Sequence, residues 1–192
     1  KATLRPYQIE GVQWLLEHYN NGLGACLADD MGLGKTLQTL STLVAVQEKL
    51  EVEKAENIQL DLFGNEIPVA KEYLKALIVL PSSLVFNWYN EARKFTPHFR
   101  RIQYVGQNRK ILSKKLEKYD LIFTSYAVVS RDLSILEKYQ FRYLILDESQ
   151  YIKNKNSKIF KAINQLQTTH KISLSGTPIE NSLDDLWSQM QF

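Results

Sequence analysis

Three short segments of this sequence carry residues whose types and spacing suit phosphate chemistry. The first is "DDMGLGKT" at 29–36, a glycine-rich turn that ends in Lys35 and Thr36. Glycines permit the backbone torsions that let several amide N–H groups converge on phosphate oxygens, and the helix that follows adds its dipole. Lys35 would neutralise the outer phosphates, and Thr36 would offer Mg²⁺ a hydroxyl ligand. The P-loop pattern requires glycine where this chain has Asp29, so the loop alone fits a structural turn equally well.

The second segment is "YLILDESQ" at 143–150, an apolar run that ends in two adjacent carboxylates, Asp147 and Glu148. Adjacent side chains at the end of a strand point in different directions. One carboxylate can therefore reach a metal ion held by Thr36 while the other orients an attacking water, as phosphoryl transfer requires. A solvated turn explains two acids equally well in isolation, but their occurrence together with the lysine loop favours a nucleotide site.

The third segment is "KISLSGTPIEN" at 171–181, where an apolar run is followed by Ser175, Gly176 and Thr177. A helix-capping turn is the alternative interpretation of these residues. Three loops of this kind can form one site if their strands are parallel, because ligands bind at the carboxyl ends of the strands of an open parallel sheet. The strands must therefore share one sheet and one direction.

The rest of the chain supports such a sheet, since short apolar runs alternate with segments of helical period. We therefore predict an α/β fold with a mostly parallel central sheet and helices on both faces. The predicted strands lie at 24–28, 76–80, 102–105, 121–124, 143–147 and 171–174. One predicted helix, at 4–19, has an apolar face made of Ile9, Val12, Leu16 and Tyr19. A second has Leu84, Trp88, Ala92 and Phe95 on one face, which makes Trp88 a core residue rather than a platform for stacking bases.

Composition predicts one globular domain over residues 1–192, because 44% of the chain is hydrophobic and 23% is charged. No apolar run approaches the roughly 18 residues that a membrane span needs, so no membrane partner is expected. The single Cys26 excludes an internal disulfide and favours a reducing compartment.

An acidic stretch at 48–73 interrupts the alternation of strands and helices and predicts a surface insertion. Residues 93–118 hold nine basic side chains against one acid, which could attract a polyanion or form an ordinary solvated surface.

In their order along the chain, these segments resemble the motifs of the first RecA-like lobe of a superfamily 2 helicase-like ATPase of the SWI/SNF family. The resemblance covers nearly the whole chain apart from the acidic stretch. The segments that carry it are "LRPYQIEGVQWL" (4–15), "DDMGLGKT" (29–36), "LIVLPSSLVFNWYNE" (77–91), "DLIFTSYAVV" (120–129), "LDESQYIKN" (146–154) and "LSGTPIEN" (174–181).

The resemblance implies roles for particular residues. ATP would be bound by Gln8, which would recognise adenine, and by Asp30, Met31, Gly32, Leu33, Gly34, Lys35 and Thr36. Mg²⁺ would be held by Thr36 and Asp147, and the catalytic set would be Lys35, Asp147, Glu148 and Gln150. DNA phosphates would be held by Pro81, Ser82, Ser83, Thr124, Ser125 and Tyr126. Coupling between ATP and DNA would involve Ser175, Gly176 and Thr177.

Two positions depart from the usual pattern of the family. Gln150 replaces the common histidine after the acid pair; its amide can hydrogen-bond toward the "SGT" loop but cannot titrate. Asp30 replaces the usual glutamate beside the lysine loop. Neither change touches Lys35, Thr36, Asp147 or Glu148.

The resemblance further implies an ATPase that moves along double-stranded DNA, with ATP bound between this lobe and a second RecA-like lobe of the same parent chain. DNA-bound protein complexes would be further partners. Residues 1–192 alone would then bind nucleotide weakly and hydrolyse little. The expected location is the nucleus in a eukaryote, or the nucleoid in a bacterial cytoplasm.

Three alternatives come from other functional classes. A small-molecule P-loop kinase would leave "LRPYQIEGVQWL" and "SGTPIEN" without a role. A nucleotide-sensing module that does not hydrolyse ATP would be expected to have lost Lys35 or Glu148. A relative of the RNA-directed DEAD-box proteins would read Asp-Glu-Ala-Asp where this chain has "DESQ".

Overall fold

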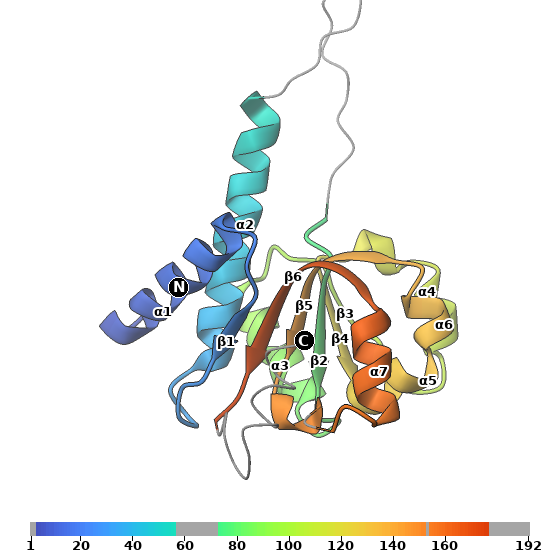
Figure 1. Ribbon diagram of the computed structural model, residues 1–192. Helices are drawn as coiled ribbons and strands as arrows, with labels where there is room; N and C mark the ends of the chain where they lie inside the picture. Colours follow the sequence, from blue (N-terminus) through green and yellow to red (C-terminus); the bar gives the residue numbers. More distant parts are fainter. Residues whose placement is uncertain (1–2, 57–72, 153, 177–192) are drawn as a thin grey trace, which may run out of the picture.

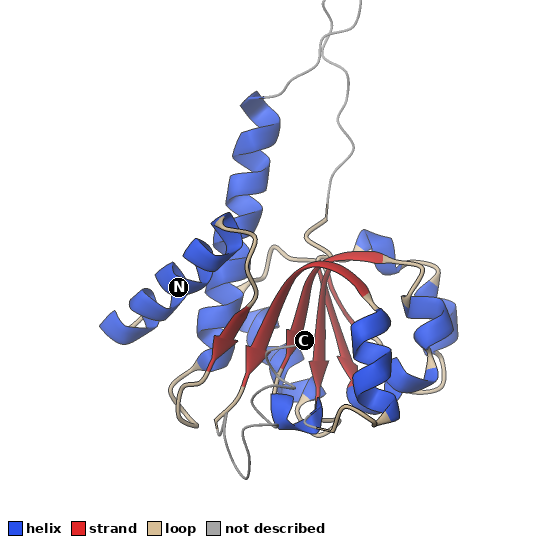
Figure 2. Ribbon diagram, in the orientation of Figure 1, coloured by secondary structure: helices blue, strands red, loops and turns tan. Residues whose placement is uncertain are grey.

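The fold is an open sheet of six strands, all paired in parallel, in the order β1-β6-β5-β2-β4-β3 (Figures 1 and 2). The computed structural model describes residues 3–56, 73–152 and 154–176. The strands are β1 (Ala25–Leu27), β2 (Ala76–Leu80), β3 (Arg101–Gln103), β4 (Leu121–Ser125), β5 (Gln140–Leu146) and β6 (Gln167–Leu174). The predicted α/β class and all six predicted strands are confirmed, although several strand ends differ from the prediction.

The largest difference in strand length is at the start of β5 and β6. Both begin a few residues before the predicted runs, because Gln140 pairs with Gln167 and Phe141 with Thr168. The polar sequence "QTTH" at the start of β6 is partly exposed. A search for continuous apolar runs therefore missed the solvent-accessible half of this strand pair.

Helices cover both faces of the sheet, with α1, α2 and α3 on one face and α4 to α7 on the other (Figure 1). Each face of the sheet carries its own hydrophobic core, and the side chains of β2 alternate between the two. Ala76, Ile78 and Leu80 pack into the core under α1, α2 and α3, whereas Leu77 and Val79 pack into the core under α4 to α7. The helices are α1 (Pro6–Asn20), α2 (Lys35–Glu56), α3 (Val85–Phe95), α4 (Arg109–Ser113), α5 (Tyr126–Arg131), α6 (Leu133–Leu136) and α7 (Lys158–Gln165), with short 3-10 turns η1 (Leu116–Lys118) and η2 (Ser149–Ile152).

The predicted apolar face of α1 is wrong in part. Ile9 is 43% exposed, and the residues that α1 buries are Gln8 and Leu15. Gly11 lies one turn from both, and a Cβ atom built on it would stand 1.9 Å from Gln38 Oε1 of α2. The helix is thus turned so that Gly11 meets Gln38 of α2, a close approach that hydrophobic periodicity does not detect.

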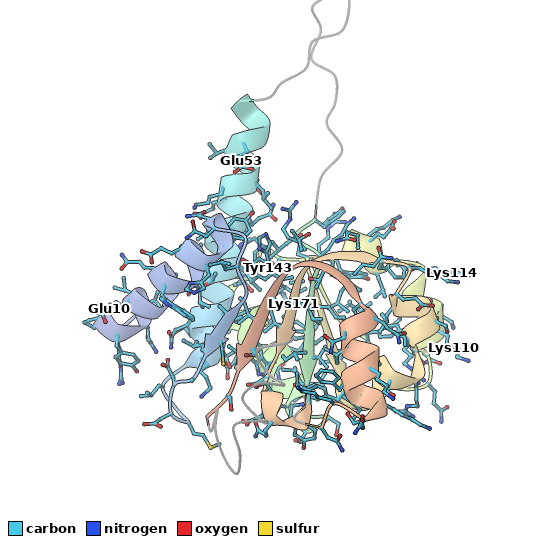
Figure 3. The ribbon with its side chains drawn as sticks, viewed as in Figure 1. Glu10, Glu53, Lys110, Lys114, Tyr143 and Lys171 are labelled. Atoms are coloured by element: carbon cyan, nitrogen blue, oxygen red, sulfur yellow. The ribbon has the colours of Figure 1, made fainter. Side chains whose placement is uncertain are left out.

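The first part of the predicted insertion at 48–73 is a continuation of α2, which runs to Glu56. Figure 3 shows this end of α2, marked by Glu53, projecting away from the sheet. Residues 57–72 lie outside the described part of the chain. None of the helices that the structure describes is both long and apolar enough to cross a membrane.

One aromatic cluster at the start of β6 makes stability depend on pH. The His170 ring lies 4.4 Å from the ring of Tyr19 and 5.3 Å from that of Tyr143, between ring centroids. Burial, and next the charge of Arg142, lower the pKa of His170. The unfolded chain therefore binds more protons than the folded chain between the two pKa values, so His170 lowers stability as the pH falls.

We accordingly expect the free energy of unfolding to fall as the pH is lowered from 7.5 through about 6.5, the ordinary pKa of histidine, toward 5. Urea unfolding at several pH values measures this dependence. The His170→Gln variant should lose less stability over the same range than the wild type, because glutamine does not titrate. Equal losses in the two proteins would contradict this assignment.

Candidate functional site

The three segments predicted to carry phosphate chemistry meet at one edge of the sheet. The lysine loop follows β1, the "SGT" loop follows β6, the acid pair follows β5, and these three strands are neighbours. Figure 2 shows their carboxyl ends, at the arrowheads, pointing toward the same edge. A Cβ atom on Gly176 would lie 3.0 Å from Met31 Cγ and 4.0 Å from Lys35 Nζ, so the backbone after β6 packs against the lysine loop. Ser175 is buried at the end of β6, and Thr177 lies outside the described residues.

The lysine loop has the backbone shape of a phosphate cradle. Gly32 and Gly34 have φ values of 85° and 82°, a region that side chains rarely adopt. Asp29 is not among the residues with positive φ, so its backbone does not require the glycine of the P-loop pattern. Its side chain instead accepts a hydrogen bond from Gln38 Nε2 at 2.9 Å, which ties the loop to α2.

Lys35 begins α2 and folds back over its own loop. Its ammonium group donates to the carbonyl oxygens of Asp29 at 2.6 Å and Asp30 at 3.1 Å. Leu33, the residue between the two glycines, lies in the same turn and is partly buried. Thr36 follows on the first turn of the helix, also partly buried. The loop thus presents a lysine, a hydroxyl and a helix start at one point.

Gln8 contacts this loop directly from α1. Its Nε2 donates to the Leu33 carbonyl at 3.1 Å, and its Oε1 accepts from Arg5 N at 3.0 Å. A Cβ atom on Gly34 would stand only 2.5 Å from Gln8 Nε2, so glycine is needed at that position for contact as well as for torsion. Gln8 therefore positions the loop, and its role toward adenine stays a prediction.

Asp147 is held from several directions at the end of β5. Trp88 Nε1–H donates to its Oδ2 at 2.8 Å, and the Glu148 backbone N–H donates to its Oδ1 at 3.0 Å. Burial raises the pKa of Asp147, while the Trp88 hydrogen bond and the Lys35 ammonium act in the opposite direction. The carboxylate is therefore fixed in orientation, and a cation bound beside it would offset its desolvation.

Glu148 adopts a φ of 51°, in the left-handed region that non-glycine residues rarely occupy. Its carboxylate accepts a hydrogen bond from Gln150 Nε2 at 2.7 Å. Gln150 Oε1 is buried and has no hydrogen-bond partner within the described part of the chain. Its amide nitrogen thus contacts the neighbouring acid. A bond from the Gln150 amide toward the "SGT" loop stays a prediction, because Thr177 lies outside the described residues.

The loops predicted to hold DNA lie together along a cleft of about 180 Å³ beside the acid pair. Its lining includes five of the six predicted residues, Pro81, Ser82, Ser83, Ser125 and Tyr126, and adds Tyr151. Thr124 is the exception, because it is fully buried and its hydroxyl donates to the Tyr104 carbonyl at 2.9 Å. It cannot offer a hydroxyl to DNA from this position.

Tyr126 differs from the prediction in a second way. Its ring lines the cleft, but its hydroxyl points inward and donates to the Asp147 carbonyl at 2.7 Å. Burial, and next the nearby charges of Asp147 and Glu148, raise the pKa of Tyr126 well above its ordinary value, so the hydroxyl stays protonated and donates. The hydrogen-bonding group of Tyr126 thus serves the acid pair and not a DNA phosphate.

Sequence reasoning missed the contacts that Trp88 and Tyr126 make to Asp147. The assignment of Trp88 to the core is confirmed, since it is 3% exposed. A buried indole N–H needs an acceptor, which is the signal that could have suggested a carboxylate partner. No comparable signal marks the Tyr126 hydroxyl, whose partner is a backbone carbonyl 21 residues away.

The basic segment 93–118 is not one surface beside the cleft. Arg100 pairs its backbone with Asp120 and Leu121 at the amino ends of β3 and β4, opposite the site. Arg109 forms hydrogen bonds of 2.6 and 3.0 Å with Asp132, which lower the pKa of that carboxyl. Figure 3 shows Lys110 and Lys114 pointing outward at the far end of the molecule from α1.

The parallel sheet with these loops at its carboxyl edge defines a RecA-like fold. Residues 7–192 match the family described as the SNF2-related domain, and the chain belongs to this family. The SWI/SNF resemblance is thereby confirmed. The small-molecule kinase and the DEAD-box relative are set aside by the same match.

Two relatives and one solved structure place the chain within larger proteins. It is 38% identical over 196 residues to the yeast "TATA-binding protein-associated factor MOT1", covering all of this chain and 10% of that protein. It is 33% identical over 197 residues to the Arabidopsis thaliana "ISWI chromatin-remodeling complex ATPase CHR17", covering all of this chain and 17% of the relative. The "Sulfolobus solfataricus SWI2/SNF2 ATPase core in complex with dsDNA" superposes with a TM-score of 0.82 at 41% identity, covering all of this chain and 36% of that one. The chain therefore spans a small part of these relatives.

Proposed function

We propose that this chain is the ATP-binding lobe of a DNA-dependent ATPase that moves along duplex DNA and remodels or displaces the proteins bound there. One observation carries the proposal: the three phosphate-type loops meet on neighbouring strands, and the cleft of the predicted DNA loops lies directly beside them. The solved relative bound to dsDNA and the relative named as a chromatin-remodelling complex ATPase support the same function.

The residues fit Mg²⁺ bound together with ATP. Magnesium is usually bound by one or two carboxylates plus substrate phosphates rather than by a cage of protein ligands. Within residues 3–56, 73–152 and 154–176, no three His, Cys, Asp or Glu side chains form a cluster that could hold a metal alone. Thr36 and Asp147 would hold the ion, which when bound neutralises charge on the phosphate oxygens.

The chain's own groups then divide the work of hydrolysis. The amides of the glycine turn and the Lys35 ammonium bind the phosphates, and Lys35 exchanges its bonds to the loop carbonyls for bonds to phosphate oxygens. Glu148 orients a water for attack on the terminal phosphorus and accepts its proton, while the bond to the leaving phosphate oxygen breaks. Gln150 holds Glu148 by its amide and takes no proton itself.

A second RecA-like lobe of the same parent chain completes the site in this proposal. The chain covers 36% of the Sulfolobus solfataricus core, which leaves room for such a lobe in a protein of that length. The isolated lobe is therefore expected to bind nucleotide and DNA weakly and to hydrolyse little ATP. Of the two predicted locations, the nuclear one agrees with the relative named as a chromatin-remodelling complex ATPase, and the bacterial nucleoid gains no support from the proteins named above.

Phosphate release by the full-length protein, measured with and without duplex DNA, tests this proposal. We expect turnover to rise several-fold with duplex DNA, and to rise less as salt increases, because phosphate contacts are sensitive to salt. Turnover that is independent of DNA would contradict the proposal. Tight ATP binding without any hydrolysis would instead support the alternative of a nucleotide-sensing module.

A further inference from the structure

Two stacked tyrosines connect the predicted DNA cleft to the acid pair. The rings of Tyr126 and Tyr151 lie 5.1 Å apart between centroids and are inclined by only 6°. Both line the cleft, but their exposure differs: Tyr126 is 3% exposed and Tyr151 is 52% exposed. Tyr151 therefore presents its ring to whatever enters the cleft, and Tyr126 lies between that ring and the interior.

Each tyrosine is also bonded to one of the two acids. The Tyr126 hydroxyl donates to the Asp147 carbonyl at 2.7 Å, and the Tyr151 backbone N–H donates to the Glu148 carbonyl at 3.1 Å. The two acceptor carbonyls are consecutive in the chain. That of Asp147 precedes the φ and ψ torsions of Glu148, and that of Glu148 follows them. A displacement of the stacked pair would act directly on these torsions.

Glu148 is the residue best placed to respond to such a displacement. Its φ of 51° lies in a region that is unfavourable for a glutamate, and such conformations persist where neighbouring contacts maintain them. Its carboxylate direction depends on these torsions, whereas Asp147 is held separately by Trp88. Strand β5 also lies between β6 and β2, and hence between the strands that lead into the lysine and "SGT" loops and the strand that leads into the cleft.

We propose that the Tyr126–Tyr151 pair is a positioning device that sets the orientation of Glu148 according to whether DNA occupies the cleft. The inference rests on the proposed function, because it assigns the route by which DNA raises ATP turnover. Tyr126 acts through the peptide of Asp147 and is a positioning residue rather than a catalytic one. A DNA strand pressing on Tyr151 moves or locks the stack, and the two carbonyl bonds transfer that constraint to Glu148.

Tyr126→Phe in the full-length protein tests the inference, because it removes one hydrogen bond and keeps the ring in the stack. We expect kcat at saturating ATP and duplex DNA to fall about three- to tenfold, the range expected from one neutral hydrogen bond. The KM for ATP and the Kd for DNA should stay near the wild-type values, since the hydroxyl faces neither ligand. A merely structural role would not separate kcat from KM and Kd in this way.

Tyr139→Phe is the matched control. The Tyr139 hydroxyl also donates to a backbone carbonyl, that of Ser113, at 2.7 Å, but away from the cleft and the acid pair. This variant should turn over like the wild type. An equal loss in both variants would overturn the inference, since it would reflect general destabilisation.

Tyr151→Ala provides a second variant that should fold, because half of that side chain is exposed. It should lower the DNA-stimulated kcat, whereas Tyr151→Phe, which keeps the stacked ring, should restore it. If DNA stimulates ATP turnover fully in the wild type and also in both Tyr126→Phe and Tyr151→Ala, this inference is overturned. The proposed function would then remain intact. A wild type that does not respond to DNA would overturn both.

Discussion

Glu148→Gln in the full-length protein should lose DNA-stimulated turnover while still binding ATP. We expect kcat to fall by about 10²- to 10⁴-fold, the usual contribution of a positioned general base. The physical reason is that an amide has nearly the shape of the carboxylate but cannot accept the proton of the attacking water. The phosphates are bound by the lysine loop, which this change does not touch, so the affinity for ATP should be close to that of the wild type.

Phosphate release at saturating ATP and DNA measures the loss, and titration with a fluorescent ATP analogue measures the affinity. Glu117→Gln is a suitable control, because Glu117 is an exposed glutamate on η1 and the substitution has the same effect on net charge. Normal turnover by Glu148→Gln would show that the base has been assigned wrongly.

Lys35→Ala should produce the opposite pattern, a loss of nucleotide affinity. A charge-assisted hydrogen bond contributes about 1.5–3 kcal/mol, so the Kd for ATP should rise roughly 10- to 150-fold. The Lys35 ammonium also bonds to the Asp29 and Asp30 carbonyls, so its removal leaves two acceptors of the loop without this partner. Both effects weaken the phosphate cradle.

Binding of the same fluorescent analogue measures this change, with Lys49→Ala as the matched control. Lys49 lies on the same helix, α2, and its ammonium donates to Asn20 Oδ1 at 2.8 Å on the exposed surface. It should bind ATP like the wild type. If Lys35→Ala kept wild-type affinity, the loop would be a structural turn after all. The pair of variants thus separates binding from hydrolysis.

Much of the site could be predicted because its parts are local in sequence. A glycine turn before a lysine, and two acids at the end of an apolar run, each lie within eight residues. Parallel strands bring such loops to a common edge, so the alternation of strands and helices was enough to place Lys35, Asp147 and Gly176 together. The predicted DNA residues met in one cleft for the same reason, with Thr124 as the exception.

The parts that could not be predicted depend on which way individual side chains point. Thr124 and Ser125 are adjacent in sequence, yet the Thr124 hydroxyl is buried against the Tyr104 carbonyl and only Ser125 is among the residues that line the cleft. The face of α1 was misjudged because a close contact between Gly11 and Gln38 decides its rotation. Neither feature has a hydrophobic signature.

The sequence by itself determined the fold class, the family and the identity of the residues at the phosphate edge. The tertiary structure alone decided how the acid pair is held: Trp88, 59 residues before Asp147, binds its carboxylate, and Tyr126, 21 residues before it, binds its carbonyl. Strand and loop patterns arise from torsions and burial, which neighbouring residues largely set. A hydrogen bond between residues that are distant in the chain depends on the packed sheet that brings them within about 3 Å. No local sequence pattern predicts such a contact.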